Sequence, residues 1–169
     1  MSAAQLILVG APAAGKTSVG RLVAERLGVP FTDTDELTEQ RLGLSLPEAA
    51  ASLSDEEVRA VEDEVCRQAL AAPGIVALSS RAVEEPALRE ELKPRAVLWL
   101  RVSATQLTRR LGMASLGMDT LSLLRQQVDA LLRMREPWYE EVATSRLDTD
   151  RLDLAATADR VEQAWEGVR

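Results

Sequence analysis

The sequence predicts an α/β fold in which a five-stranded parallel sheet is covered by helices on both faces. Short strand-like runs alternate with stretches of helical periodicity, and this alternation is typical of parallel sheets. Apolar residues make up 46% of the 169 residues, which suits one domain with a sizeable core. We therefore expect residues 1–169 to form a single three-layer domain.

The predicted strands are short runs of mostly apolar or β-branched residues, bounded by glycine, proline or polar residues. The run Leu6–Val9 is the clearest of them, since all four side chains are apolar and a parallel strand is buried on both faces. In chain order, the five predicted strands are residues 6–9, 29–32, 75–78, 96–100 and 146–148.

The predicted helices follow from apolar side chains that recur every three or four residues, together with start and stop signals. Ser45 with Glu48, and Ser54 with Glu57, have the spacing of a capping box. Pro137 is expected to stop the longest helix, with residues 138–143 able to add a short helical extension. The predicted helices cover residues 17–27, 36–42, a segment beginning at Ser45, 54–70, 85–92, 103–111, 119–136 and 155–168.

Between the first strand and the first helix, the segment Gly10–Thr17 matches the phosphate-binding pattern G-x-x-x-x-G-K-[ST]. In this strand–loop–helix context, backbone N–H groups and the helix dipole converge on a phosphate. Lys16 is expected to reach the β- and γ-phosphates of ATP, and Thr17 to offer its hydroxyl to Mg²⁺. The predicted nucleotide-binding residues are Gly10, Ala11, Pro12, Ala13, Ala14, Gly15, Lys16, Thr17 and Ser18.

Two further segments should reach the same edge of the sheet, because ligands lie beyond the carboxyl ends of parallel strands. They are Asp33–Asp35 after the second strand and Ser79–Arg81 after the third. Asp33 can hold Mg²⁺ beside Thr17, and Asp35 can accept the proton of an attacking hydroxyl. Alternatively, one of these aspartates simply caps the following helix.

Composition excludes several classes of function. The chain has no histidine, which removes Ser-His-Asp and Cys-His catalysis and histidine metal sites. Its formal charge of −7 argues against a general nucleic-acid surface, and no apolar run reaches the roughly 18–20 residues needed to span a bilayer. A single cysteine, Cys66, cannot form an internal disulfide, so we expect a cytoplasmic protein.

Spacing alone assigns no role to three arginines. Arg59 can pair with acidic neighbours on its helix, Arg135 can favour the negative helix end, and Arg110 can be a surface residue. The acidic pairs Glu84–Glu85 and Glu90–Glu91 are interpreted as a solvated face.

Several segments together resemble the shikimate kinase family, over nearly the whole chain. The early phosphate loop with Pro12 and the trailing Gly20 is similar to that of the family. The other segments are Phe31–Asp35 (F-x-D-[ST]-D), Arg41–Ser45 (R-x-G-x-S-I), Val58–Glu62 (F-R-x-x-E) and Arg135–Ala143 (R-x-P-x-Y-x-x-x-A).

The resemblance implies a P-loop kinase that uses ATP and Mg²⁺, with a mobile substrate-binding segment at about 33–62 and a lid at about 112–122. It implies that Asp35, Arg59 and Arg135 bind the hydroxyl and carboxylate groups of a small substrate, shikimate first. It further implies that Asp35 is the base, that Asp33 and Thr17 serve Mg²⁺, and that Arg110 packs on adenine. A monomer without nucleic-acid or membrane partners is expected.

The chain departs from the family pattern at two places. Ser79-Ser80-Arg81 stands where the family has three glycines, so side chains narrow or reshape the pocket. The lid stretch Gly117–Thr120 has no arginine where the family has one, and no basic residue lies between Arg110 and Arg125.

Three interpretations follow. The protein phosphorylates shikimate, with Ser80 and Arg81 in the substrate site and Arg81 in place of the lid arginine. Alternatively, its acceptor is another small hydroxy acid or polyol, or it is a catalytically weak ATP-binding protein that signals to a partner. Nucleoside monophosphate kinases usually carry several lid arginines and GTPases an N-K-x-D segment, and this chain has neither.

Overall fold

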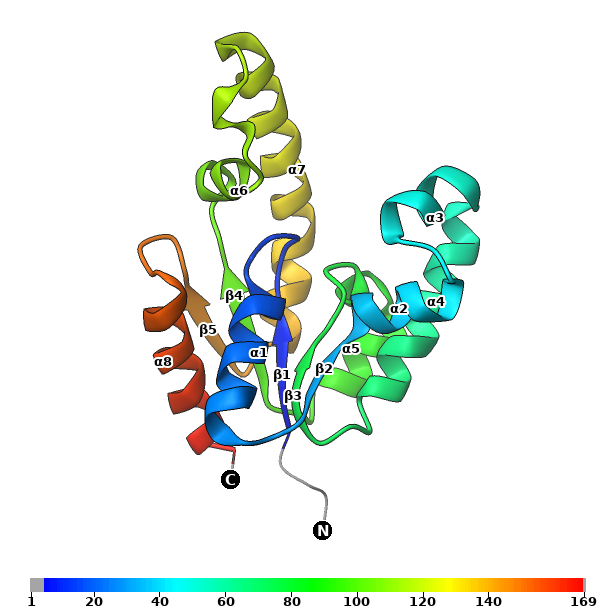
Figure 1. The fold of residues 1–169 in the computed structure, drawn as a ribbon, viewed down its shortest axis with the longest axis vertical. Helices are drawn as coiled ribbons and strands as arrows, with labels where there is room; N and C mark the ends of the chain where they lie inside the picture. Colours follow the sequence, from blue (N-terminus) through cyan, green and yellow to red (C-terminus); the bar gives the residue numbers. More distant parts are fainter. Residues whose placement is uncertain (1–4, 169) are drawn as a thin grey trace.

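A computed structural model of the chain describes residues 5–168 (Figure 1). Its centre is a sheet with strand order β2-β3-β1-β4-β5, in which each neighbouring pair runs parallel. The predicted five-stranded parallel sheet is therefore confirmed. The strands are β1 (Gln5–Val9), β2 (Phe31–Asp33), β3 (Gly74–Ala77), β4 (Val97–Arg101) and β5 (Ser145–Asp148).

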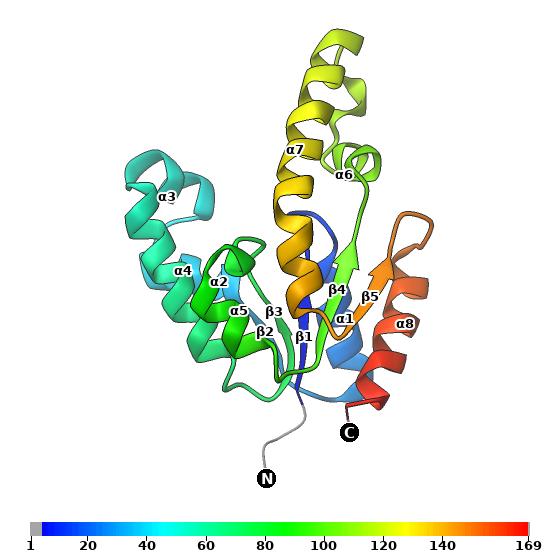
Figure 2. The same ribbon diagram turned by 180° about the vertical axis from the view of Figure 1, so that it is seen from behind.

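Helices cover both faces of the sheet, with α1 and α8 in front in Figure 1 and α5 and α7 in front in the reverse view of Figure 2. Two short 3₁₀ helices, η1 (Ala82–Glu84) and η2 (Met113–Ser115), lie in the connections. The α-helices are α1 (Lys16–Leu27), α2 (Thr34–Leu42), α3 (Leu46–Ser52), α4 (Asp55–Ala69), α5 (Pro86–Leu92), α6 (Ala104–Arg110), α7 (Met118–Val142) and α8 (Leu154–Glu166).

Strand β1 shows why the predicted apolar run is buried on both faces. Leu6 and Leu8 pack in the core beneath α1 and α8, whereas Ile7 and Val9 pack in the core beneath α4, α5 and α7. All four side chains are at most 2% exposed. The period-2 geometry of a strand sends alternate residues to opposite faces, so one apolar strand serves both layers.

Both predicted capping boxes are present, at the starts of α3 and α4. The expectation that Pro137 stops the long helix is wrong, because α7 continues through Pro137 to Val142. Tyr139 and Val142 are each 2% exposed in the core, and Tyr139 stacks on Trp99 with 5.6 Å between ring centroids. Burial of these side chains offsets the hydrogen bond that proline cannot make.

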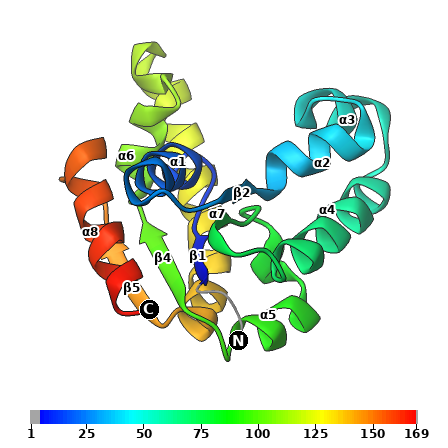
Figure 3. The ribbon, with the colours of Figure 1, turned by 60° about the horizontal axis from the view of Figure 1, so that its bottom comes forward.

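The long helix and the α3–α4 pair project beyond the sheet on either side of the loop that follows β1 (Figure 1). The start of β1 and the end of α8 lie at the opposite end of the molecule from these projections, and Figure 3 turns this end toward the viewer. No helix within residues 5–168 is long and apolar enough to cross a membrane.

Gly74, the first residue of β3, gives a test of the sheet packing. Its φ is +87°, and a Cβ atom there would collide with the backbone carbonyl oxygen of Pro30. Gly74→Ala should therefore lower the free energy of unfolding by about 2–5 kcal/mol, from backbone strain and overpacking together. Chemical denaturation measures this, with Gly117→Ala, where no heavy atom lies within 4 Å, as the control. Equal stability of both variants would contradict this packing.

Candidate active site

The sheet brings three polar segments to one edge. Asp33, the last residue of β2, pairs with Ala77 of β3, and Ala77 pairs with Leu8 of β1. The loops that follow these three neighbouring strands therefore leave the sheet side by side. The hydroxyl of Thr34 accepts a hydrogen bond from the Ser79 N–H at 2.7 Å, which fixes the Asp33–Asp35 segment against Ser79–Arg81.

The loop after β1 has three residues at positive φ, a feature typical of anion-binding loops. Gly10, Ala13 and Gly15 have φ values of 154°, 58° and 97°. A Cβ atom at Gly10 would lie 2.6 Å from the carbonyl oxygen of Leu100, so only glycine fits there. A non-glycine residue at positive φ costs about 1–3 kcal/mol, and such strain is concentrated at functional sites. The loop ends at Gly15, the N-cap of α1.

Lys16 is the buried cation of this loop. Its side-chain ammonium donates to the carbonyl oxygens of Gly10 at 2.8 Å and Ala11 at 2.9 Å. Burial lowers the pKa of Lys16 to about 8, and the charge of Arg135 acts in the same direction, whereas Asp35 and Asp33 raise it. Lys16 is thus held in the loop as a poorly solvated cation. The charges of Asp33, Asp35 and Arg135 act on it.

Asp33 both contacts Thr17 and caps a helix. Its Oδ2 accepts a hydrogen bond from the Thr17 hydroxyl at 2.6 Å, while Oδ1 accepts from the N–H groups of Asp35 and Glu36 at the start of α2. The alternative that an aspartate here caps the helix is therefore correct for Asp33, and it coexists with a place beside Thr17.

The Thr17–Asp33 pair fits Mg²⁺, a cation that prefers oxygen ligands. Within residues 5–168 no three acidic, cysteine or histidine side chains cluster as a metal site. One hydroxyl and one carboxylate fit an ion that binds mainly through nucleotide phosphates and water, as Mg²⁺ commonly does.

Asp35 projects a carboxylate with unused acceptor capacity. Its Oδ1 is buried and has no hydrogen-bond partner within the described residues. Burial is the largest influence and raises the pKa of Asp35, although the charge of Lys16 opposes the shift. A carboxylate with a raised pKa and a free oxygen is suited to accept a proton.

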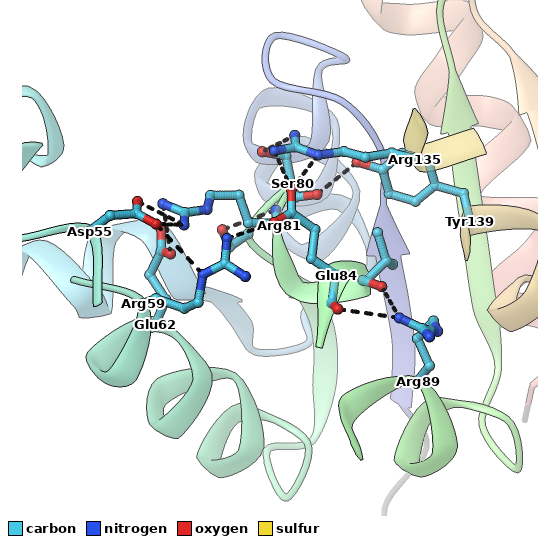
Figure 4. A network of polar contacts seen from close by, with 11 residues as sticks. Asp55, Arg59, Glu62, Ser80, Arg81, Glu84, Arg89, Arg135 and Tyr139 are labelled. Atoms are coloured by element: carbon cyan, nitrogen blue, oxygen red, sulfur yellow. Dashed lines mark hydrogen bonds and ion pairs between the residues drawn. The ribbon is translucent and has the colours of Figure 1, made fainter. Parts of the chain in front are cut away.

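Arg59 and Arg135 meet at one carboxylate, that of Glu84 (Figure 4). Arg59, on α4, contacts Oε2 of Glu84 at 2.8 Å, and Arg135, on α7, contacts Oε1 at 2.7 and 2.8 Å. Arg135 is buried, and its Nη1 also lies 3.4 Å from the hydroxyl oxygen of Ser80. The two arginines thus share one site although they lie 76 residues apart in the chain.

Arg81 lies on the α4 side of this group (Figure 4). Its guanidinium contacts Asp55 at 2.9 Å and Glu62 at 3.6 Å. Burial raises the pKa of Glu62, and the nearby charge of Arg81 opposes that shift. The Ser80 carbonyl accepts a hydrogen bond from the Tyr139 hydroxyl at 2.8 Å, so the continuation of α7 past Pro137 also positions the loop after β3.

Arg110 lies at the other end of the phosphate loop. It donates to the carbonyl oxygens of Ala14 at 3.2 Å and Thr149 at 3.0 Å. A cavity of about 380 Å³ lies there, lined by Gly15, Ser18, Arg110 and the segment around Asp153, among others. Arg110 is therefore exposed, as the surface interpretation predicts, and its side chain also lines a cavity beside the phosphate loop.

Glu84 is the site residue that the sequence interpretation missed. It was expected on a solvated face, yet its side chain is 12% exposed and pairs with two arginines. No local pattern indicates this, because both partners come from helices distant in sequence. Glu62 and Tyr139 also contact residues distant in sequence, since Glu62 pairs with Arg81 and Tyr139 with Ser80.

Comparison with known proteins adds to this geometry. The family model for shikimate kinase matches residues 12–166. A shikimate kinase of Mycobacterium avium is 39% identical over 160 residues, which cover 91% of this chain and 89% of the relative. The chain belongs to the shikimate kinase family. It is an ATP-dependent small-molecule kinase that uses Mg²⁺.

Other relatives agree with this assignment. A shikimate kinase of Mycobacterium tuberculosis is 36% identical over 165 residues, covering 94% of this chain and 92% of the relative. The structure of a shikimate kinase from Acinetobacter baumannii, in complex with shikimate, superimposes with a TM-score of 0.84. That match has 27% identity and covers 98% of this chain and 94% of the other.

Proposed function

We propose that this kinase transfers the γ-phosphoryl group of ATP to a hydroxyl group of shikimate. The observation that carries the proposal is the placement of Asp35, Arg59 and Arg135 around the Ser79–Arg81 loop, beside Lys16 and the phosphate loop. A base, a pair of guanidinium groups and a phosphate site within one region suit a hydroxylated carboxylic acid. The relatives that are named shikimate kinases support the same acceptor.

The donor half of the proposed site is the segment Gly10–Ser18. Its N–H groups and Lys16 bind the triphosphate, with Arg110 against adenine in the cavity beside Thr149. Thr17 and Asp33 hold Mg²⁺, which neutralises phosphate charge when it is bound.

The acceptor half is formed by Asp35, Arg59, Ser80, Arg81 and Arg135. Arg59 and Arg135 donate to the acceptor carboxylate, for which planar guanidinium groups are well matched. The oxygen of the acceptor hydroxyl forms a bond to the γ-phosphorus of ATP, and Asp35 accepts the proton that this hydroxyl loses. The bond between the γ-phosphorus and the β-phosphate oxygen breaks, and ADP leaves. Ser80 and Arg81 complete the wall next to Asp35.

We further propose that residues 1–169 act as one domain and as a monomer in the cytoplasm, with no nucleic-acid or membrane partner. The segments at about 33–62 and 112–122 are proposed to move over the bound substrates. They contain α2, α3, η2 and the ends of α4 and α7 that project from the sheet in Figure 1.

The test is a coupled assay for ADP release from Mg·ATP, with and without shikimate, followed by a panel of other hydroxy acids and polyols. Release stimulated by shikimate above every other compound supports the proposal. ADP release stimulated only by another compound would identify that compound as the acceptor in place of shikimate. Nucleotide binding without stimulated ADP release would favour a nucleotide-binding protein with little catalysis.

The pKa of Lys16 leads to a prediction for nucleotide capture. Because its pKa is about 8 in the free protein, Lys16 loses its charge above that pH and binds phosphate less well. We expect kcat/KM for ATP to fall by roughly tenfold per pH unit above this value. The kcat should stay level to higher pH, because bound phosphates raise the pKa of Lys16. Parallel pH profiles of kcat and kcat/KM for ATP would contradict this assignment.

A further inference from the structure

We propose that Glu84 is a resident carboxylate in the carboxylate-binding site of the acceptor, and that an acidic acceptor must displace it in order to bind. Glu84 thereby determines specificity, because it reduces the preference for an acid over its neutral analogue. This inference rests on the proposed function, in which Arg59 and Arg135 bind the acceptor carboxylate.

The contacts of Glu84 are those expected of a bound carboxylate ligand. Each of its two oxygens is taken by a different arginine, Oε1 by Arg135 and Oε2 by Arg59, at 2.7–2.8 Å. These are short, charge-assisted hydrogen bonds. Glu84 takes Nη2 of Arg59 and both Nε and Nη2 of Arg135, so a second carboxylate can use these donors only after Glu84 has left.

The backbone that carries Glu84 is fixed, so its side chain is a built part of the site. Arg89 donates to the carbonyl oxygens of Val83 at 2.7 Å and Glu84 at 3.3 Å (Figure 4). Glu84 is also the last residue of η1, whose Ala82 and Val83 are buried in the core. Displacement therefore requires rotation of the Glu84 side chain alone, with the arginines and the loop left in place.

The balance of charge among the arginines and carboxylates of the site also favours displacement of Glu84. Within the described residues, Arg59, Arg81 and Arg135 are already matched by three carboxylates, those of Asp55, Glu62 and Glu84. A bound acid would add a fourth negative charge to this partly buried group. The acid therefore binds at the expense of a resident carboxylate, and Glu84 is the one that contacts both proposed substrate arginines.

The experiment measures binding of shikimate and of its neutral carboxamide by calorimetry, with Mg·ADP present. It compares the wild-type protein with Glu84→Gln, which keeps the shape of the side chain and removes its charge. Glu85→Gln is the matched control, because Glu85 carries the same charge one residue along and forms no ion pair within residues 5–168.

We expect Glu84→Gln to bind shikimate about tenfold or more tightly than the wild type does, and to bind the carboxamide with little change. The wild type should prefer the acid to the carboxamide by less than about fivefold, and Glu85→Gln should behave as the wild type. Thermal unfolding adds a second readout. Glu84→Gln should melt at a lower temperature, because Arg135 loses its buried partner, and shikimate should stabilise the variant more than the wild type.

A wild-type preference for the acid above that fivefold limit, or shikimate binding that Glu84→Gln leaves unchanged or weakens, would overturn the role of Glu84. The ratio of the shikimate and carboxamide affinities of the wild-type protein tests the role of Glu84 even if Glu84→Gln does not fold. Failure of both compounds to bind to either protein, while Mg·ADP binds, would instead overturn the proposed acceptor and this inference with it.

Discussion

Replacing Asp35 with asparagine should lower kcat by about 10²- to 10⁴-fold while KM for ATP changes little. The amide keeps the size of the side chain but cannot accept the hydroxyl proton.

The same Asp35→Asn variant should be more stable than the wild type at neutral pH. Burial raises the pKa of Asp35, so the folded protein holds this proton more tightly than the unfolded chain does. Stability is therefore lost as pH rises through the window between the ordinary aspartate pKa of 3.8 and the raised pKa of Asp35.

Steady-state kinetics and thermal unfolding on the same preparation test both halves of this expectation. Glu36→Gln is the control, since Glu36 is the next residue and its carboxylate pairs with Arg21 on the surface. The control should keep the wild-type kcat. An active Asp35→Asn variant would exclude Asp35 as the base. An Asp35→Asn variant that is inactive and also less stable than the wild type would contradict the raised pKa of Asp35. It would show that neighbouring groups stabilise the Asp35 carboxylate more than burial destabilises it.

Replacing Lys16 with methionine should lower kcat/KM for ATP by about 10²- to 10³-fold, the effect of removing one preorganised donor from a developing negative charge. Calorimetry should show weaker ADP binding in the same variant, because the ammonium that is held against the Gly10 and Ala11 carbonyls is the proposed phosphate ligand. Lys93→Met is the matched control, since Lys93 is an exposed lysine that pairs with Glu90 and Glu141. Normal nucleotide binding by Lys16→Met would contradict the position of Lys16 in the donor half.

The strand, loop and helix of the proposed donor half could be predicted from the sequence because their residues are local. The phosphate loop, its strand and its helix are continuous, and the fixed spacing of Gly10, Gly15 and Lys16 already predicts phosphate binding. The two capping boxes are local in the same sense, and both are present in the structure. The placement of Asp33 beside Thr17 then follows from a parallel sheet whose loops share one edge. The strand order β2-β3-β1-β4-β5 does not follow from the sequence pattern, because many orders are compatible with the same five strands.

The acceptor half could be predicted only in part, because its side chains meet through long-range packing. The apolar pattern does not show that α7 passes through Pro137, although this continuation places Tyr139 against Ser80. Nor does it show that Glu84 lies between two arginines from separate helices. Local spacing assigned Glu84 to a solvated face, and burial by α4 and α7 overrides that assignment.

The most direct test of the central claim is a single-turnover reaction with ATP labelled at the γ-phosphate, Mg²⁺ and shikimate, in which the label is followed by separation of the products. The proposed function predicts that the label moves from ATP to shikimate, and that Asp35→Asn slows this transfer without preventing nucleotide binding. Label that remains in ATP, or is released only as inorganic phosphate, would contradict it.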